Sequence, residues 1–117
     1  MECPQFMSML FEIQVNAHIA HLQTPSFAEH KALNELYDGI DGALDAYAEA
    51  YQGKYGIIKG YKPIVLNEGS DMVSYLTAKM ADVEKYRSML TEGYLQQLVD
   101  NIQELLSTSI YKLKFLS

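Results

Sequence analysis

The sequence predicts an all-α protein, a four-helix bundle with one long crossover connection between its second and third helices. Apolar residues recur at intervals of three or four along most of the chain, which is the period of one helix face. Prolines occur only at positions 4, 25 and 63, where helices are expected to begin or end. Four of the seven glycines lie within residues 53–69, which predicts one irregular segment long enough to cross the bundle.

The chain has 117 residues, of which 49% are hydrophobic and 21% charged, so we expect one domain over residues 1–117. No uninterrupted apolar run exceeds three residues, and therefore no membrane-spanning helix is expected. The single cysteine, Cys3, favours a reducing, cytoplasmic compartment. The net charge of −6, from 9 basic and 15 acidic residues, makes nucleic acid an unfavoured partner.

The first helix is expected over residues 5–23 and carries two apolar stripes. One stripe holds Phe6, Leu10, Ile13, Ala17 and Ala20, and the other holds Phe11, Val15, Ile19 and Leu22. A helix that is apolar on two sides is either deeply buried or faces a partner chain. We therefore expect a homo-oligomer, at least a two-fold dimer.

The second helix has the clearest start signal. Ser26 follows Pro25 as the predicted N-cap, and Glu29 three residues later completes a capping box. Gly53 is suited to end this helix. The crossover over residues 53–69 carries apolar side chains that need cover, so we expect it to pack across the bundle: Ile57, Ile58, Ile64, Val65 and Leu66.

The third helix is expected to begin at the Ser70-Asp71 cap, and the break before the last helix is expected at residues 91–93. The last helix has apolar residues at alternating intervals of three and four through residues 95–113. This spacing is typical of the seam of a bundle helix.

Polar residues on the first two helices suggest a metal site. His18 and His21 lie three apart on the first helix, and five more follow one strip of the second: His30, Asn34, Asp41, Asp45 and Glu49. Imidazole and carboxylate together are the ligand set of iron, zinc or manganese. The alternative is a solvated acidic helix face with hydrogen-bonded structural histidines. The spacing leaves both interpretations open.

The stretch from His18 to Glu49 resembles Dps, the ferritin-like DNA-binding protein from starved cells. In that family a histidine late in the first helix precedes a histidine of the second helix by twelve residues, as His18 precedes His30 here. An aspartate and a glutamate four residues apart come later, as Asp45 and Glu49 do. Asn34 stands where the family has an aspartate.

The resemblance implies a ferritin-like bundle with a ferroxidase centre between two subunits. His18 and His30 would come from one chain, and Asp45 and Glu49 from its two-fold mate. An alignment through Ala20-His21 puts His21 in the place of His18, and both remain candidates. Asn34 and Asp41 are further candidate ligands. Iron would bind there as ferrous ion and be oxidised, typically by peroxide.

Segments 22–33, 51–61 and 111–116 also resemble short, mostly uncharacterised Dps-like proteins of tailed phages. This likeness implies a phage origin, with a role in the host-cell cytoplasm or in the virion. It also implies an alternative function: a structural or interaction protein that keeps the ferritin-like bundle without metal chemistry.

A last feature is a run of lysines and tyrosines at the start of the crossover: Lys54, Tyr55, Lys59, Tyr61 and Lys62. Aromatic rings interleaved with lysines can stack on bases and touch phosphates, so this loop is a candidate partner-binding segment. The favoured interpretation is a crossover whose tyrosines pack on the bundle, since a tyrosine ring is apolar and its hydroxyl is polar.

Overall fold

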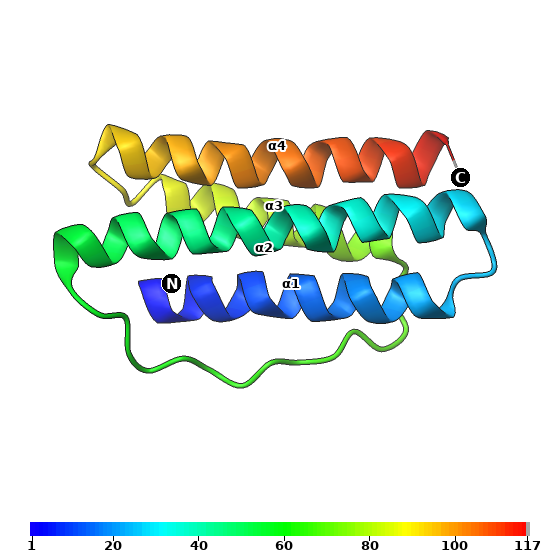
Figure 1. Cartoon of the computed structure of the whole chain (residues 1–117), viewed down its shortest axis with the longest axis horizontal. Helices are drawn as coiled ribbons and strands as arrows, with labels where there is room; N and C mark the ends of the chain where they lie inside the picture. The colour runs from blue at the N-terminus through cyan, green and yellow to red at the C-terminus, as the bar shows by residue number, and fades with distance from the viewer. Residues whose placement is uncertain (117) are drawn as a thin grey trace.

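The computed structural model describes residues 1–116 of the chain, and this part contains four helices (Figure 1). In chain order they are α1 (Cys3–Gln23), α2 (Phe27–Tyr55), α3 (Met72–Arg87) and α4 (Gly93–Phe115). No strand occurs among these residues, so the predicted all-α class is confirmed. Ser117, the last residue of the predicted domain, lies outside the described residues.

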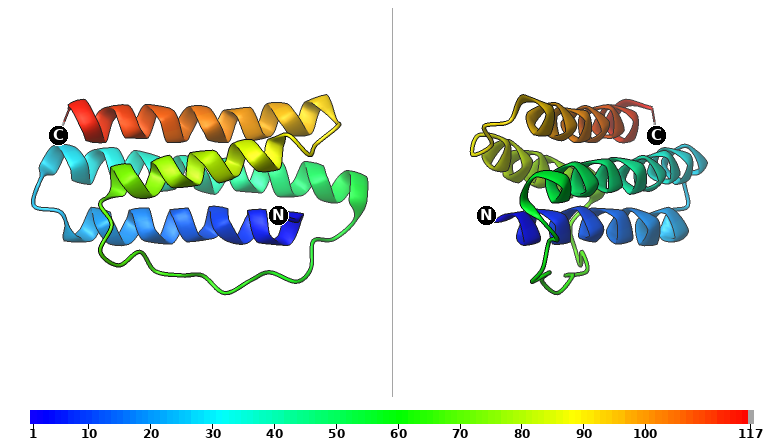
Figure 2. Two further views of the ribbon diagram at one scale, coloured as in Figure 1. Left: turned by 180° about the vertical axis from the view of Figure 1, so that it is seen from behind. Right: turned by 60° about the vertical axis from the view of Figure 1, so that its left-hand side comes forward.

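The helices form a ring in which each one packs antiparallel to both of its neighbours. α1 contacts α2 and α3, and α4 also contacts α2 and α3. α1 and α4 run in one direction, whereas α2 and α3 run in the other (Figures 1 and 2). Since α2 and α3 are consecutive and point the same way, the chain between them must return along the whole bundle. This connection, residues 56–71, is the predicted crossover, and we call it the strap.

Helices α2 and α3 begin at the predicted N-caps, but the predicted capping box of Ser26 and Glu29 is only half formed, because the backbone N–H of Ser26 donates to the Thr24 hydroxyl and not to Glu29. The Ser26 hydroxyl accepts a hydrogen bond from the backbone of Glu29 at 3.2 Å, and the Asp71 carboxylate accepts one from the backbone of Ser74 at 2.9 Å. Each bond satisfies a backbone donor that has no partner within the helix. The chain also breaks as expected between α3 and α4.

Two helix ends differ from the prediction. α2 runs past Gly53 to Tyr55, and it ends because Gly56 takes φ of +90°, a conformation that glycine adopts without strain. α1 begins at Cys3, before the predicted start at residue 5, because Glu2 and Gln5 form a capping box around its first turn. Cys3 is consequently buried in that turn.

The core is built from one face of every helix. Its largest fully buried side chains include Phe6, Leu10, Ile13, Leu33, Leu36, Ile40, Tyr47, Leu76, Leu95, Ile102 and Leu106. The first predicted stripe of α1 faces this core. The second stripe faces outward instead: Leu22 is 71% exposed, and Phe11, Val15 and Ile19 are half-buried.

Three polar side chains of α1, spaced one turn apart, hold the strap by its backbone. Ser8 accepts from the N–H of residue 62 at 2.8 Å, and Glu12 accepts from the N–H of residue 65 at 3.2 Å. Asn16 accepts from the N–H of residue 67 at 2.9 Å and donates to the carbonyl of residue 65 at 3.0 Å. Residues four apart share one helix face, so α1 presents a ladder of partners to an extended segment.

The expectation that the strap's apolar side chains are covered is wrong for most of them. Ile58 is 7% exposed, but the other four are exposed: Ile57 (71%), Ile64 (43%), Val65 (67%) and Leu66 (52%). The physical reason is the mode of attachment. The strap is fastened by its backbone to α1, so its side chains are free to face away from the bundle.

Acid should weaken the strap through Glu12. Burial alone would raise the pKa of this carboxyl, but the bonds from Lys79, the Tyr75 hydroxyl and the backbone of Val65 lower it below its ordinary value. A lowered folded-state pKa stabilises the fold above the ordinary value of about 4.3, and this contribution is lost as the pH falls through the folded-state pKa.

We therefore expect the wild type to lose more stability between pH 7 and pH 3 than the Glu12→Gln variant, whose amide does not titrate in this range. Urea unfolding at both pH values measures the difference. Equal losses in the two proteins would show that Glu12 does not couple the strap to pH.

Gly39 and Gly42 lie near each other on α2 but have different surroundings. A Cβ on Gly39 would come within 2.9 Å of Leu105 of α4, whereas a Cβ on Gly42 meets nothing within 4 Å. Alanine favours a helix over glycine by about 1 kcal/mol, so Gly42→Ala should stabilise the protein by about that amount. Gly39→Ala should give a smaller gain or a loss. Equal gains in urea unfolding would contradict the close packing of α2 on α4.

Candidate functional site

His21 and His30 hold each other where α1 ends and α2 begins. The Nδ1 atom of His21 lies 2.6 Å from the carbonyl oxygen of His30, and the Nδ1 atom of His30 lies 2.7 Å from the carbonyl oxygen of His21. A carbonyl oxygen only accepts, so each Nδ1 carries the hydrogen. In the neutral rings, Nε2 therefore keeps its lone pair.

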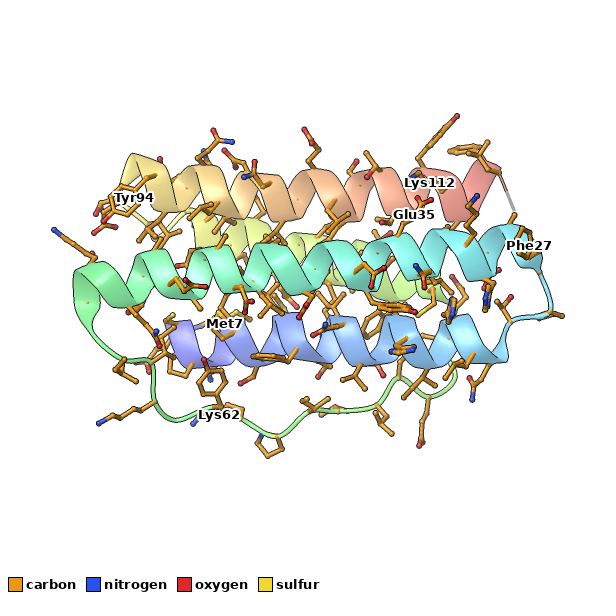
Figure 3. All side chains as sticks on the ribbon, viewed as in Figure 1. Met7, Phe27, Glu35, Lys62, Tyr94 and Lys112 are labelled. Carbon is orange, nitrogen blue, oxygen red and sulfur yellow. The ribbon has the colours of Figure 1, made fainter. Side chains whose placement is uncertain are left out.

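The local fold explains this contact. The chain reverses within residues 24–26, which brings the first turn of α2 beside the last turn of α1 (Figure 3, near Phe27). Carbonyls of a last helical turn have no partner within the helix, and His30 donates to one of them. The two rings stack with centroids 3.5 Å apart and planes inclined by 20°, and His21 is buried.

His18 lies beside this pair but in different surroundings. Its ring is exposed and stacks on Tyr37, with centroids 4.1 Å apart and planes inclined by 12°. The His18 and His21 rings are 5.8 Å apart and inclined by 67°. The structure thus brings all three histidines of the chain into one cluster with Tyr37.

Asn34 joins the edge of the cluster through hydrogen bonds on both sides of its amide. The Tyr37 hydroxyl donates to its Oδ1 at 2.6 Å, and its Nδ2 donates to Asp38 at 3.1 Å. Asp41, one turn beyond Tyr37, accepts from Gln14 of α1 at 3.2 Å. Both residues are therefore engaged within the chain.

Asp45 and Glu49 are the two predicted ligands that lie apart. Both residues are exposed on α2, and neither side chain makes a hydrogen bond or ion pair within residues 1–116. They follow His30 by 15 and 19 residues, which on a helix rising 1.5 Å per residue is about 22–28 Å. Within one chain they cannot meet the histidines. Accordingly, residues 1–116 contain no group of three or more His, Cys, Asp or Glu placed to hold a metal ion.

The lysines and tyrosines around the start of the strap serve different purposes. Tyr55, in the last turn of α2, donates a hydrogen bond to Glu92, and this bond raises the pKa of Tyr55 to about 12. Tyr61 packs against Phe11 with ring centroids 6.1 Å apart, as predicted for a tyrosine lying on the bundle. Lys54, Lys59 and Lys62 are exposed.

A buried cluster that no sequence pattern indicated lies at the other end of α1. The hydroxyls of Tyr47 and Tyr86 are 2.6 Å apart, and Phe6 stacks on Tyr86 with centroids 3.9 Å apart. Cys3 lies beside Tyr86 and Tyr51, and burial raises the pKa of its thiol. The count of nine tyrosines was the only signal, and it gives no position.

Comparison with known proteins gives a family. A family of unknown function, DUF5856, matches residues 21–113. The chain belongs to this family. It is also 26% identical, over 113 residues, to the uncharacterised 14.6 kDa protein of the mobD-ri intergenic region of Enterobacteria phage T4; the match covers 93% of this chain and 85% of that protein. No solved structure matches the chain.

These matches agree with the predicted likeness to short phage proteins. Neither description mentions ferritin, Dps or a metal, so those assignments stay predictions. Among residues 1–116, none of the helices combines the length and the apolar character that crossing a membrane requires.

The two histidines of α1 should differ in their contribution to stability. His21→Ala removes a buried ring and its hydrogen bond to the His30 carbonyl, which should cost about 1–3 kcal/mol. His18→Ala changes an exposed ring and should stay within about 0.5 kcal/mol. Urea unfolding of the two variants measures this. Similar costs would contradict the structural role of the His21–His30 contact.

Proposed function

We propose that two copies of this chain bind ferrous iron at a histidine–carboxylate site between them and oxidise it, as the resemblance to Dps implies. The observation that carries the proposal is the hydrogen bonding of His21 and His30. Each ring donates a hydrogen bond from Nδ1 to the other residue's carbonyl oxygen, which leaves the lone pair of Nε2 for a metal. Histidines that ligate metals usually donate their other ring hydrogen to a carbonyl or carboxylate, which fixes the ring and its tautomer.

The topology supports a ferritin-like assignment of the bundle. Ferritin-like folds are four-helix bundles with one long crossover connection. Here the strap is that connection, and all neighbouring helices run antiparallel. A fold alone does not determine a function, so the proposal depends on the side chains of the site.

A second copy is required because of where the carboxylates lie. In an antiparallel pair of α2 helices related by a two-fold axis, the partner's Asp45 and Glu49 reach His30 when the axis passes near residues 38 and 39, about midway between them. Exposed carboxylates without partners within residues 1–116 are free to complete such a site.

The ring geometry limits which histidines share an ion. Two stacked rings point their in-plane lone pairs in nearly parallel planes, so His21 and His30 cannot ligate one ion until one ring turns. With metal–nitrogen bonds of about 2.0–2.1 Å, two imidazoles on one ion have centroids about 5–6 Å apart. His18 and His21, 5.8 Å apart and inclined by 67°, have this relation. We assign one ion to this pair and leave His30, held by its Nδ1 hydrogen bond, to the partner's Asp45 and Glu49.

The chemistry follows from the donor set. Imidazoles favour transition metals, and carboxylates favour the harder ferric product; zinc and manganese are the other metals that this set accepts. Each ferrous ion gives up one electron, so two ions and two protons reduce one hydrogen peroxide to two waters. We place this reaction in the cytoplasm of the host cell, with the virion as the other location.

A second candidate function is favoured by Asn34. Where the resemblance has an aspartate, this chain has an amide whose two polar atoms are already bonded to Tyr37 and Asp38. The chain would then be a structural or interaction protein of a phage, and the His21–His30 contact would serve only to join α1 to α2.

An anaerobic ferrous titration of metal-stripped protein, followed by peroxide, tests the first proposal. We expect saturable binding and fast oxidation, with affinity lowered at least about tenfold in His18→Ala and in Glu49→Gln. Glu104→Gln, which neutralises another exposed glutamate, is the matched control and should bind as the wild type does. Binding that is the same in all four proteins, or missing from the wild type, would contradict the iron site and favour the second function.

A further inference from the structure

The strap presents an apolar strip to solvent. Ile57, Ile64, Val65 and Leu66 are between 43% and 71% exposed, and they lie on a segment held against α1. The outward stripe of α1 adds further apolar surface, including Leu22 at 71% exposure. An exposed apolar surface of this kind marks an interaction site more often than an isolated side chain does.

The charges along the strap are divided by sign. Lys59 and Lys62 precede the apolar centre, and Glu68 follows it (Figure 3 labels Lys62, outside the ring of helices). All three are exposed, and none forms an ion pair within the described part of the chain. The strap is therefore basic at one end, apolar in the middle and acidic at the other end.

Between residues 64 and 67, one backbone edge of the strap is also unpaired. The N–H groups of Val65 and Asn67 donate to α1. Those of Ile64 and Leu66 make no hydrogen bond within residues 1–116. In an extended chain, alternate residues point their N–H groups to opposite sides, so the free groups face away from α1. Such an edge is a template for pairing with another extended segment.

We propose that two copies of this chain pair strap to strap, antiparallel, about a two-fold axis at Val65. Such an axis puts Lys62 opposite the partner's Glu68, because each lies three residues from it, and it repeats the same contact on the other side. It also puts Ile64 opposite the partner's Leu66, so that the free N–H groups of each copy face the backbone of the other. The apolar strips meet at the centre. A parallel arrangement would instead oppose lysine to lysine, which disfavours it.

Other occupants fit this surface less well. A nucleic acid or an anionic membrane would be attracted by Lys59 and Lys62 but repelled by Glu68 and by the net charge of −6. A second copy matches both ends. The pairing does not rest on the proposed function: it uses the strap, whereas the iron site needs contact between two α2 helices, and it requires no metal to form.

The test uses the metal-free full chain in sedimentation equilibrium. We expect a dimer whose dissociation constant rises at least about tenfold in Lys62→Glu and in Glu68→Lys, because each change opposes like charges across the interface. The double variant, Lys62→Glu with Glu68→Lys, should restore the dimer to near wild-type affinity. Lys85→Glu, an exposed lysine on α3, is the matched control and should leave the affinity unchanged.

Each remaining outcome overturns the inference or separates it from the iron proposal. A monomeric wild type, or a dimer unaffected by the single charge reversals, would overturn the pairing of straps. If a dimer that is unaffected by the charge reversals binds iron, the proposed function would still be supported. Duplex DNA binding that is lost in Lys62→Glu and not restored in the double variant would also overturn the pairing. A strap dimer that binds no iron would contradict the iron proposal alone.

Discussion

The strap is fastened to α1 by Ser8, Glu12 and Asn16, and the arrangement of the other helices depends on this attachment. The three side chains take up backbone groups of an extended segment that has no secondary structure of its own to satisfy them. By fixing the path of the strap, they determine at which end of the bundle α3 begins and therefore its direction. Glu12 and Asn16 also bond Tyr75 of α3, so the same side chains join the third helix to the first.

At the turn between α1 and α2, one pair of contacts serves two purposes. The His21–His30 exchange satisfies a carbonyl at the end of α1 and fixes the tautomer of both rings. A purely structural role uses Nδ1 and ignores Nε2, whereas a ligand role uses both atoms. The two roles are therefore compatible, because the structural role needs only Nδ1. They differ in whether Nε2 binds a metal ion. Asp45 and Glu49, exposed and unpaired within the described chain, are the groups that a second copy would bring to it.

Much of the fold could be predicted because its signals are local. Ser26 and Asp71 cap helices with their own side chains, and the glycines at residues 53–69 marked the crossover. What could not be predicted depends on contacts between distant segments. Ile64, Val65 and Leu66 were expected to be covered, but sequence does not reveal that a loop is held by its backbone. Likewise, spacing alone does not distinguish His18 from His21, although only His21 is buried and hydrogen-bonded to His30. The phenol pair of Tyr47 and Tyr86 joins residues 39 apart and leaves no pattern in the sequence.

The path of the strap has a consequence for how the chain folds. α1 with α2, and α3 with α4, are two helical hairpins whose internal contacts are close in sequence, and such local contacts form quickly. Within residues 1–116, the helix contacts that join the two hairpins are those of α2 with α4 and of α1 with α3. The entropy lost in closing the connecting loop grows slowly with its length, so the strap does little to delay their meeting. The molecule is thus two fast-forming halves joined by a tether, and a chain cut within the tether would still contain two complementary hairpins able to recombine.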